Sequence, residues 1–326
     1  MKRARDESDS AAHPYGRLTP DLVLAAVDRQ GFASDGRLLA LNSFENRVYQ
    51  LGLEDGGFVV AKFYRPARWS DAAIREEHAF SLELAEAELP VLAPIARNGE
   101  TLFTHERFRY AVFPRMGGRA PELEGNDTAQ WLGRTLARVH LVGARRPFRA
   151  RARLDFATLV EAPARAVLAS ALLPAHVRAR YEAAIAALRA HGTAFAALAD
   201  NPSLRLHGDC HPGNVLWREH QGPLLVDFDD CRTGPAVQDL WMLCTGAEAQ
   251  RDALLEGYAE FRDFDARELA LVPALRLMRQ VHYAGWIAER WSDPAFPRAF
   301  PFAAEPTWWE RHVRDLGEAA AELEDG

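Results

Sequence analysis

The sequence is poor in several features that would assign it to a familiar class of protein. Its 326 residues contain only three cysteines, Cys210, Cys231 and Cys244, and no CxxC pair. This odd number argues against a disulfide framework and favours a reducing, cytoplasmic setting. The opening MKRARDESDSAAHP lacks the apolar core of a secretory signal. No run of about 18 apolar residues occurs that could cross a membrane.

An excess of positive charge is also missing. The chain has 39 basic and 46 acidic residues, a net charge of -7, which argues against a nucleic-acid or membrane-surface binder. The local exception is a cluster of five arginines that we interpret as a solvated loop, with docking of an acidic partner as the alternative: Arg145, Arg146, Arg149, Arg151 and Arg153. Coiled-coil heptads are not evident, so we expect a monomer.

The first third of the chain has the pattern of a small sheet with helices. Residues 1–14 are expected to form a mobile tail. Thr19 and Pro20 then favour a helix start. Strand-like runs cover residues 38–41 and 47–53, and EDGG indicates a hairpin into FVVAKFY. A helix capped by Ser70 or Asp71 follows, and further strands complete a five-stranded antiparallel sheet in an N-lobe of residues 15–113.

The remainder of the chain, residues 114–326, is mainly helical in pattern. The segments DTAQWLGRTLARVHLVG, GPAVQDLWMLCTG and ELALVPALRLMRQVHYAGWIAERW are each expected to be helices, with short strands between the first and second. The composition changes at the glycine-containing segment 116–118, near the lobe boundary. We therefore predict an α+β, two-lobed fold with a larger helical C-lobe.

Residues 206–230, LHGDCHPGNVLWREHQGPLLVDFDD, carry the densest set of polar side chains that could take part in catalysis or metal binding. His207, Asp209 and His211 alternate, as the ligands of a hydrolase metal on a strand would. However, the proline and glycine after His211 break a strand and turn this side chain away, and Asn214 would have no role. A purely structural loop is the other alternative, although Asp227 ends an apolar run where an unpaired carboxylate is costly.

Phosphoryl transfer accounts for more of the same residues. Asp209 and Asn214 have the D-x-x-x-x-N spacing of a kinase catalytic loop, and Asp227 follows on its own short strand. Such chemistry needs one carboxylate to orient the attacking hydroxyl. It also needs an amide oxygen and a second carboxylate to hold Mg²⁺, a hard ion that prefers oxygen ligands.

The sequence upstream supplies the remaining parts of a phosphoryl-transfer site. A kinase places a strand lysine on the nucleotide phosphates and pairs it with a glutamate on the next helix. VVAKFY offers Lys62, and IREEHAF offers Glu76 or Glu77. We favour Glu77, because Phe80 and Leu84 continue from it at helical spacing on the core-facing side.

These motifs together resemble a known family. HGDCHPGN, VDFDD and GPAVQDLWML are similar to the aminoglycoside phosphotransferase-type branch of the protein-kinase-like fold. LNSFENRVYQ and KFYRPARW also resemble segments of the bacterial stress-response Ser/Thr protein kinases within that branch. The resemblance covers nearly the whole chain after the N-terminal tail and implies a two-lobed, ATP-dependent and Mg²⁺-dependent kinase.

The resemblance implies a role for each matched residue. Asp209 would accept the proton, Asn214 and Asp227 would bind Mg²⁺, and Lys62 would pair with Glu77 to anchor the phosphates. The remaining implied roles concern ATP contact by Ser43, backbone contacts to adenine from residues 112–118, and support of the catalytic loop. Phe113 and Met116 are the candidates in that linker, and His207 and Asp239 are the candidates for loop support.

The chain departs from the eukaryotic kinase pattern in two places. NSFENR contains no glycine, so the Ser43 hydroxyl would partly replace backbone N–H groups at the phosphates. Asp227 begins D-F-D rather than D-F-G, and only a short segment separates it from GPAVQDLW, so a long activation segment is absent. The sequence does not assign roles to Asp229, Asp230 or Cys210.

The resulting hypothesis is a Mg-ATP-dependent kinase of protein Ser/Thr hydroxyls, its own included. A small-molecule kinase would use the same catalytic residues. For that alternative, Asp229 and Asp230 with Tyr283, Trp286 and Trp291 could line a pocket for a cationic metabolite, although we favour core packing for these aromatic side chains. A non-catalytic nucleotide-binding scaffold is disfavoured because Lys62, Asp209, Asn214 and Asp227 are all present.

Overall fold

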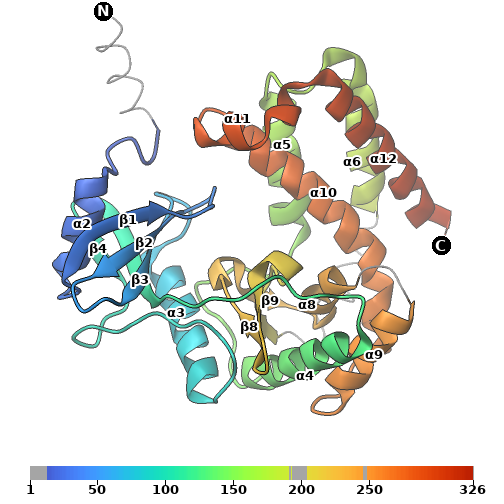
Figure 1. Cartoon of the computed structure of the whole chain (residues 1–326). Coiled ribbons are helices and arrows are strands. Elements are labelled where there is room, and N and C mark those ends of the chain that lie inside the picture. The colour runs from blue at the N-terminus through green and yellow to red at the C-terminus, as the bar shows by residue number, and fades with distance from the viewer. Residues whose placement is uncertain (1–12, 191, 193–203, 245–247, 326) are drawn as a thin grey trace, which may run out of the picture.

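The computed structural model describes residues 13–190, 192, 204–244 and 248–325. Residues 1–12, which make up most of the expected N-terminal tail, lie outside the described residues. Figure 1 shows an antiparallel sheet with flanking helices at one end of the chain and a larger, mainly helical part at the other. This is the α+β, two-lobed arrangement that the sequence predicts.

The N-lobe is built around a five-stranded antiparallel sheet of order β1-β2-β3-β5-β4. Its elements are α2 (Pro20–Asp28), β1 (Ser34–Ala40), β2 (Arg47–Leu53), β3 (Phe58–Phe63), α3 (Asp71–Glu86), β4 (Phe103–His105) and β5 (Phe108–Pro114). Lys62 lies on the central strand, in register with Val48 of β2 and Ala111 of β5. A lysine in this position is held by two neighbouring strands and has little freedom to move.

The helix starts in this lobe follow the predicted caps. Thr19 accepts a hydrogen bond from Leu22 N at 3.3 Å, and Ser70 accepts one from Ala73 N at 3.2 Å. Ser70, rather than Asp71, is therefore the N-cap of α3. These bonds satisfy amide groups that have no partner inside the helix, so each cap fixes where its helix begins.

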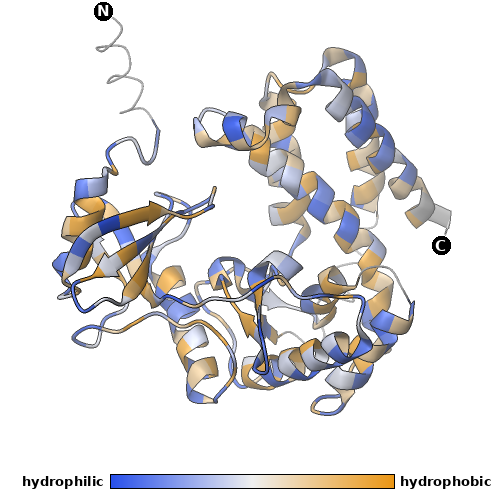
Figure 2. Ribbon diagram, viewed as in Figure 1, coloured by the Kyte–Doolittle hydropathy of each residue, from blue (hydrophilic) through white to orange (hydrophobic). Residues whose placement is uncertain are grey.

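Apolar residues on both faces of the sheet form the N-lobe core. One cluster joins α2 through Val23 and Val27 to Leu51, Phe63 and Tyr110 of the sheet. In Figure 2 the sheet is largely orange or white, whereas α12 alternates between blue and orange along its length. The apolar residues of the sheet are thus buried against α2, and the outer helix α12 is amphipathic.

The C-lobe is mainly helical. Its helices are α4 (Asn126–Gly143), α5 (Ala162–Ala169), α6 (Arg178–Ala190), α8 (Val237–Leu240), α9 (Glu248–Ala259), α10 (Val272–Glu289), α11 (Ala295–Ala299) and α12 (Pro306–Asp325). Two short antiparallel pairs interrupt them: β6 (Leu204–Leu206) with β9 (Arg232–Gly234), and β7 (Val215–Arg218) with β8 (Gly222–Leu225). The described helices include none that is both long and apolar enough for a membrane span.

Short helical turns connect these elements. One is the π-helical turn η1 (Ala157–Glu161), and the others are the 3-10 turns η2 (Ala175–Val177), η3 (Pro212–Asn214), η4 (Phe228–Asp230), η5 (Trp241–Leu243), η6 (Ala266–Leu271) and η7 (Pro301–Ala304). The turns η3 and η4 lie within the polar segment 206–230. Their tight backbone brings several polar side chains close together over a short distance.

Helix α3 joins the two lobes. Phe80 of α3 packs edge-on against Phe148 and Phe228, with ring centroids 5.5 and 5.9 Å apart. It belongs to the apolar cluster that also contains Leu132 and Leu136 of α4. Because this cluster includes residues next to the polar segment, packing of α3 fixes the position of the sheet relative to that segment.

Candidate active site

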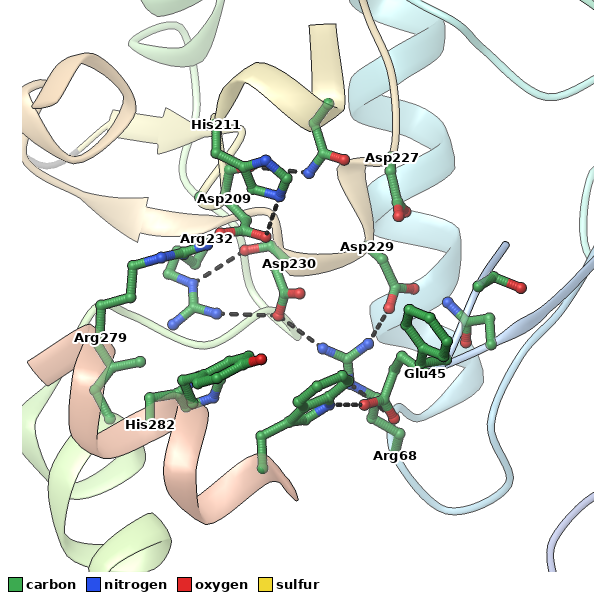
Figure 3. Close-up of a pocket in the computed structure, with 18 of the residues that line it drawn as sticks. Glu45, Arg68, Asp209, His211, Asp227, Asp229, Asp230, Arg232, Arg279 and His282 are labelled. Atoms are coloured by element: carbon green, nitrogen blue, oxygen red, sulfur yellow. Dashed lines mark hydrogen bonds and ion pairs between the residues drawn. The ribbon is translucent and has the colours of Figure 1, made fainter. Parts of the chain in front are cut away.

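A pocket of about 410 Å³ lies between the lobes. It is lined by the turn at residues 42–46, by Arg68, by parts of the segment 208–232, and by one side of α10. Figure 3 shows the acidic side chains of the polar segment pointing into this space, opposite Arg279 and His282 of α10. Residues that are far apart in the sequence therefore meet in one cavity.

Lys62 reaches the polar segment from the sheet. Its ammonium nitrogen lies 2.8 Å from Asp227 Oδ1, 3.2 Å from Asp229 Oδ1 and 3.5 Å from Glu77 Oε1. Burial alone would lower the pKa of Lys62, but the three carboxylates raise the pKa well above its usual value. The predicted contact with Glu77 is present, although Asp227 is the nearer partner.

Glu77 also binds an arginine from the cluster that we interpreted as a solvated loop. Arg151 Nη2 lies 2.7 Å from Glu77 Oε2, and the Arg151 side chain is fully buried. The solvated-loop interpretation is therefore wrong for Arg151, because a buried carboxylate needs a second cation beside Lys62. Glu76 has a different role, since it accepts backbone N–H bonds from residues 149–151 at 2.7–2.9 Å.

The catalytic-loop segment is shaped by Gly208 and Asp239. Gly208 has φ +86°, and a Cβ atom there would lie 2.1 Å from Asp230 O, so only glycine fits. The buried carboxylate of Asp239 accepts hydrogen bonds from His207 N and Gly208 N, both at 2.8 Å. Its third partner is His140 Nε2 at 3.1 Å. Asp239 of α8 therefore ties the start of the loop to the helical core.

His207 does not face the pocket. Its side chain is fully buried, its Nε2 lies 2.9 Å from Val226 O, and its ring centroid is 4.5 Å from that of Phe228. Among the described residues, no group of three His, Cys, Asp or Glu side chains is arranged to hold a metal ion. A hydrolase metal bound by His207, Asp209 and His211 is thus incompatible with this geometry.

Asp209 lies in the pocket between two nitrogen groups. Arg279 Nη1 donates to its Oδ1, and His211 Nε2 lies 3.5 Å from its Oδ2. Burial would raise the pKa of Asp209, but the bond from His211 and the charge of Arg279 lower the pKa far below its usual value. We expected the proline after His211 to turn it away, and that expectation is wrong because the chain folds back into η3.

Asn214 and Asp227 form an oxygen-donor pair. Asn214 Nδ2 donates to Asp209 O at 3.0 Å, so its amide oxygen is the atom suited to a metal. Asp227 has φ +61°, a left-handed conformation that is costly for a non-glycine residue, and its side chain is 52% exposed. One amide and one carboxylate fit Mg²⁺, because this ion usually takes its other ligands from phosphates and water.

Asp229 and Asp230 are bound by arginines of the protein. Arg68 pairs with Asp229 and lies 2.8 Å from Asp230 Oδ1, while Arg232 lies 3.1 Å from the same oxygen. Burial would raise the pKa of Asp230, but Arg68 and Arg232 lower it below its usual value. These carboxylates line the pocket, yet their charges are already balanced, which gives them a structural use that the sequence did not indicate.

The predicted ATP-contacting residues divide into two groups. Ser43 lines the pocket, and its Oγ accepts a hydrogen bond from Val48 N at 3.1 Å, which stabilises the glycine-free turn. Phe113 and Met116 do not line this pocket. Phe113 packs edge-on against His78 with ring centroids 6.4 Å apart, and Met116 is exposed in the segment that leads to the C-lobe.

Aromatic side chains of α10 form the wall opposite the polar segment. Tyr283 and Trp286 stack with ring centroids 6.0 Å apart, and both line the pocket. Tyr283 is 40% exposed, so the favoured interpretation of core packing is wrong for this residue. Its spacing on the helix could not reveal the difference, because α10 packs into the core along one side while the side that carries Tyr283 faces the cavity.

Comparisons with known proteins agree with this geometry. Stress response kinase A of Salmonella choleraesuis (strain SC-B67) is 44% identical over 311 residues, which is 93% of this chain and 92% of the relative. Stress response kinase A of Escherichia coli (strain K12) is 42% identical over 325 residues, or 97% of each chain. A relative in Salmonella typhimurium (strain LT2), 44% identical over 93% of this chain and 92% of its own length, is named serine/threonine protein kinase RdoA.

Solved structures share the fold at much lower sequence identity. The amicoumacin kinase hAmiN has a TM-score of 0.69 at 17% identity, covering 90% of this chain and 92% of its own. A microcompartment-associated aminopropanol kinase has a TM-score of 0.67 at 19% identity, covering 91% of this chain and 99% of its own. Residues 37–272 match the phosphotransferase enzyme family. This range contains the polar segment and nearly all of the sheet. The chain therefore belongs to the phosphotransferase enzyme family.

Proposed function

We propose that this protein is a Mg-ATP-dependent kinase that phosphorylates Ser or Thr hydroxyls of proteins, its own included. The observation that carries the phosphotransferase part is the 2.8 Å contact between the buried Lys62 of the sheet and Asp227, which lines the pocket between the lobes. A nucleoside triphosphate bound there would meet the buried ammonium group of Lys62 on one side and the oxygens of Asn214 and Asp227 on the other.

Each pocket residue then has a defined role. Lys62, held by Glu77, would neutralise charge on the phosphates, and Asn214 and Asp227 would hold Mg²⁺. Asp209 accepts the proton of the acceptor hydroxyl while the oxygen of that hydroxyl forms a bond to the γ-phosphorus. The bond from that phosphorus to the β–γ bridging oxygen breaks, and ADP leaves. Catalysis is then mainly positioning and charge neutralisation.

Several further observations support a protein acceptor. Relatives that align over 92–97% of their own length are named stress response kinases, and one is named a serine/threonine protein kinase. The pocket also opens beside exposed residues of α10, including Tyr283 and Arg279, which an extended polypeptide could reach.

The three cysteines are free thiols, which suits a cytoplasmic enzyme.

A small-molecule kinase is the second candidate. The fold is shared with an aminopropanol kinase and with choline kinase LicA, the latter at a TM-score of 0.62. The aromatic wall of Tyr283 and Trp286 is the feature of this pocket that suits a compact organic acceptor.

The two candidates are separated by following the label from γ-³²P-ATP. The purified protein is incubated with Mg²⁺ and labelled ATP, first alone, then with a bacterial protein extract, and then with a metabolite extract free of protein. Label on the protein itself or on polypeptides supports the proposal. Label that appears only in the metabolite fraction would replace the protein acceptor with a small molecule.

A further inference from the structure

The arginines that line the pocket differ in how fully they are used. Arg68 and Arg232 have side chains that are 15% and 10% exposed, and both bind the carboxylates that follow Asp227. Arg279 is 43% exposed. Within the described part of the chain, Asp209 is the only carboxylate at ion-pair distance from Arg279. Arg279 is therefore the pocket arginine that can most readily exchange its partner.

The position of Arg279 conflicts with the role proposed for Asp209. Arg279 occupies Oδ1 of Asp209, and His211 lies 3.5 Å from Oδ2 (Figure 3). An acceptor hydroxyl needs one of these oxygens, and a carboxylate paired with a guanidinium is a weaker proton acceptor. His211 is held by the short turn η3, with its Nδ1 accepting from Gly213 N at 3.0 Å. Arg279, at the end of a long exposed side chain, is the group that can move.

Movement of Arg279 requires a new negative partner, since an unpaired guanidinium beside Asp209 would return to it. The other carboxylates nearby do not provide one, because Asp229 and Asp230 are already bound by Arg68, Arg232 and Lys62. His282, which also lines this side of the pocket, has its pKa lowered by burial and adds no negative charge. In the proposed function the phosphates of the nucleotide are already bound by Lys62 and Mg²⁺, so the new partner comes with the acceptor.

We propose that Arg279 is a specificity-determining residue that binds an acidic side chain next to the Ser or Thr of a polypeptide acceptor, and that this exchange releases Asp209 for the hydroxyl. This inference rests on the proposed protein-kinase function and adds the charge of its substrate. A cationic acceptor would meet Arg279 as a like charge and would leave the pair with Asp209 intact. The arginine thus both selects acidic segments and keeps Asp209 covered until one binds.

The test uses pairs of synthetic peptides that contain one Ser and differ only in flanking Glu or Lys residues, placed on either side. Label transfer from γ-³²P-ATP is measured as kcat/KM with the full-length protein. We expect the wild type to prefer Glu-flanked Ser by about tenfold or more, the range of a charge-assisted contact. Arg279→Glu should reverse this preference, and Arg279→Lys should keep its sign at a smaller size, because lysine cannot bind a carboxylate through two nitrogens.

A matched control lies one turn earlier on α10. Arg276 is exposed and does not line this pocket, so Arg276→Glu makes the same change of charge and should keep the wild-type preference. Arg279→Gln covers the case in which the reversed charge prevents turnover, and its Glu-to-Lys ratio should fall close to one. Two results would overturn the inference. One is an Arg279→Gln variant whose ratio of kcat/KM for Glu-flanked over Lys-flanked peptides equals that of the wild type. The other is a wild-type protein that prefers the Lys-flanked peptides.

The same reactions separate this inference from the proposed function. Autophosphorylation and labelling of any peptide show that the protein kinase reaction itself occurs. If label reaches protein while the ratio is insensitive to Arg279, only the selection by Arg279 is wrong. If the wild type labels no polypeptide at all but labels metabolites, the protein-kinase function is wrong and the acidic-peptide inference is wrong with it.

Discussion

At the scale of single residues, the pocket depends on carboxylates with different partners. Asp209 is paired with Arg279 and His211, whereas Asp227 is paired with Lys62 and is half exposed. Both are acidic and only 18 residues apart in sequence, yet one lies toward α10 and the other toward the sheet. These different environments suit the roles that we propose, a proton acceptor for Asp209 and a metal ligand for Asp227, and substitutions should distinguish the two.

We expect Asp209→Ala to remove turnover and to leave nucleotide binding intact. Loss of a general base costs about 10²- to 10⁴-fold in rate, while the nucleotide contacts that we propose for Lys62 and Asp227 would not involve Asp209. The measurement is single-turnover label transfer together with titration of a fluorescent ATP analogue in the presence of Mg²⁺. Asp227→Ala is the contrasting variant, and it should weaken binding of the Mg-nucleotide specifically. Wild-type turnover in Asp209→Ala would remove Asp209 from the mechanism.

The sequence reveals some of these residues better than others. Lys62, Asp209, Asn214 and Asp227 are recognisable because their spacing and their neighbouring apolar runs are local signals. The partners that set their charge carry no such signal. Arg279 comes from a helix 70 residues further along the chain, and it has the pattern of an ordinary solvated helix residue until α10 is placed over the pocket.

At the scale of elements, the polar segment is held in place by a helix of one turn. Sequence patterns predict a longer helix around GPAVQDLWMLCTG, whereas α8 covers only Val237–Leu240 and continues as the 3-10 turn η5. Likewise α10 begins at Val272, after η6, because Pro273 suits the first turn of a helix and not its interior. Local pattern finds such elements, but tertiary contacts decide where they end.

Although α8 is short, its residue Asp239 holds the start of the polar segment in place. Its buried carboxylate receives two backbone N–H bonds and the ring of His140. Burial would raise the pKa of Asp239, but the hydrogen bonds from His140 and from the backbone N–H of Gly208 lower the pKa below its usual value. A lowered pKa in the folded state means that Asp239 stabilises the fold fully above its unfolded pKa near 4, and that this stabilisation is lost as pH falls further.

We therefore expect Asp239→Ala to lower the free energy of unfolding by roughly 3 kcal/mol at pH 7, since two amides and a histidine lose a buried partner. The difference from wild type should shrink as the pH falls below about 4. Thermal unfolding followed by circular dichroism at several pH values provides the measurement. Asp252→Ala, an exposed aspartate of α9, is the control and should change stability by less than about 0.5 kcal/mol. A pH-independent loss would contradict the linkage to Asp239.

At the scale of the whole molecule, the two lobes are joined by more than the linker and α3. Arg47 Nη2 lies 3.0 Å and Arg65 Nη2 lies 2.8 Å from the carboxylate of Asp293, which follows α10 in the C-lobe. Glu45 adds a bond from Trp286 Nε1 at 2.5 Å and an ion pair with Arg290 Nε at 2.8 Å. The turn that would cover the nucleotide is thus attached to the helix that would contact the acceptor.

This connection between distant parts of the chain could not be predicted from the sequence. The sequence does indicate the two lobes, because strand-like alternation gives way to helical periodicity near residue 114. The pairing of Arg47 and Arg65 with Asp293 depends on how the lobes face each other across more than 220 residues. These charges come into contact because the lobes pack against each other, an arrangement to which α3 contributes through Phe80.

Asp293→Ala tests whether this ion network holds the turn over the pocket. The side chain is nearly fully buried, so its removal leaves two arginines without their shared carboxylate, a change that typically costs about 3–5 kcal/mol. Because Arg47 and Arg65 belong to the sheet side, the turn at residues 42–46 should open more often. Its backbone amides should then exchange with deuterium at least about tenfold faster, while those of α12 stay protected. Asp315→Ala, which removes an exposed ion pair of α12, is the control with an expected effect below about 1 kcal/mol. Unchanged exchange at the turn in Asp293→Ala would mean that this carboxylate is not needed to hold the turn over the pocket.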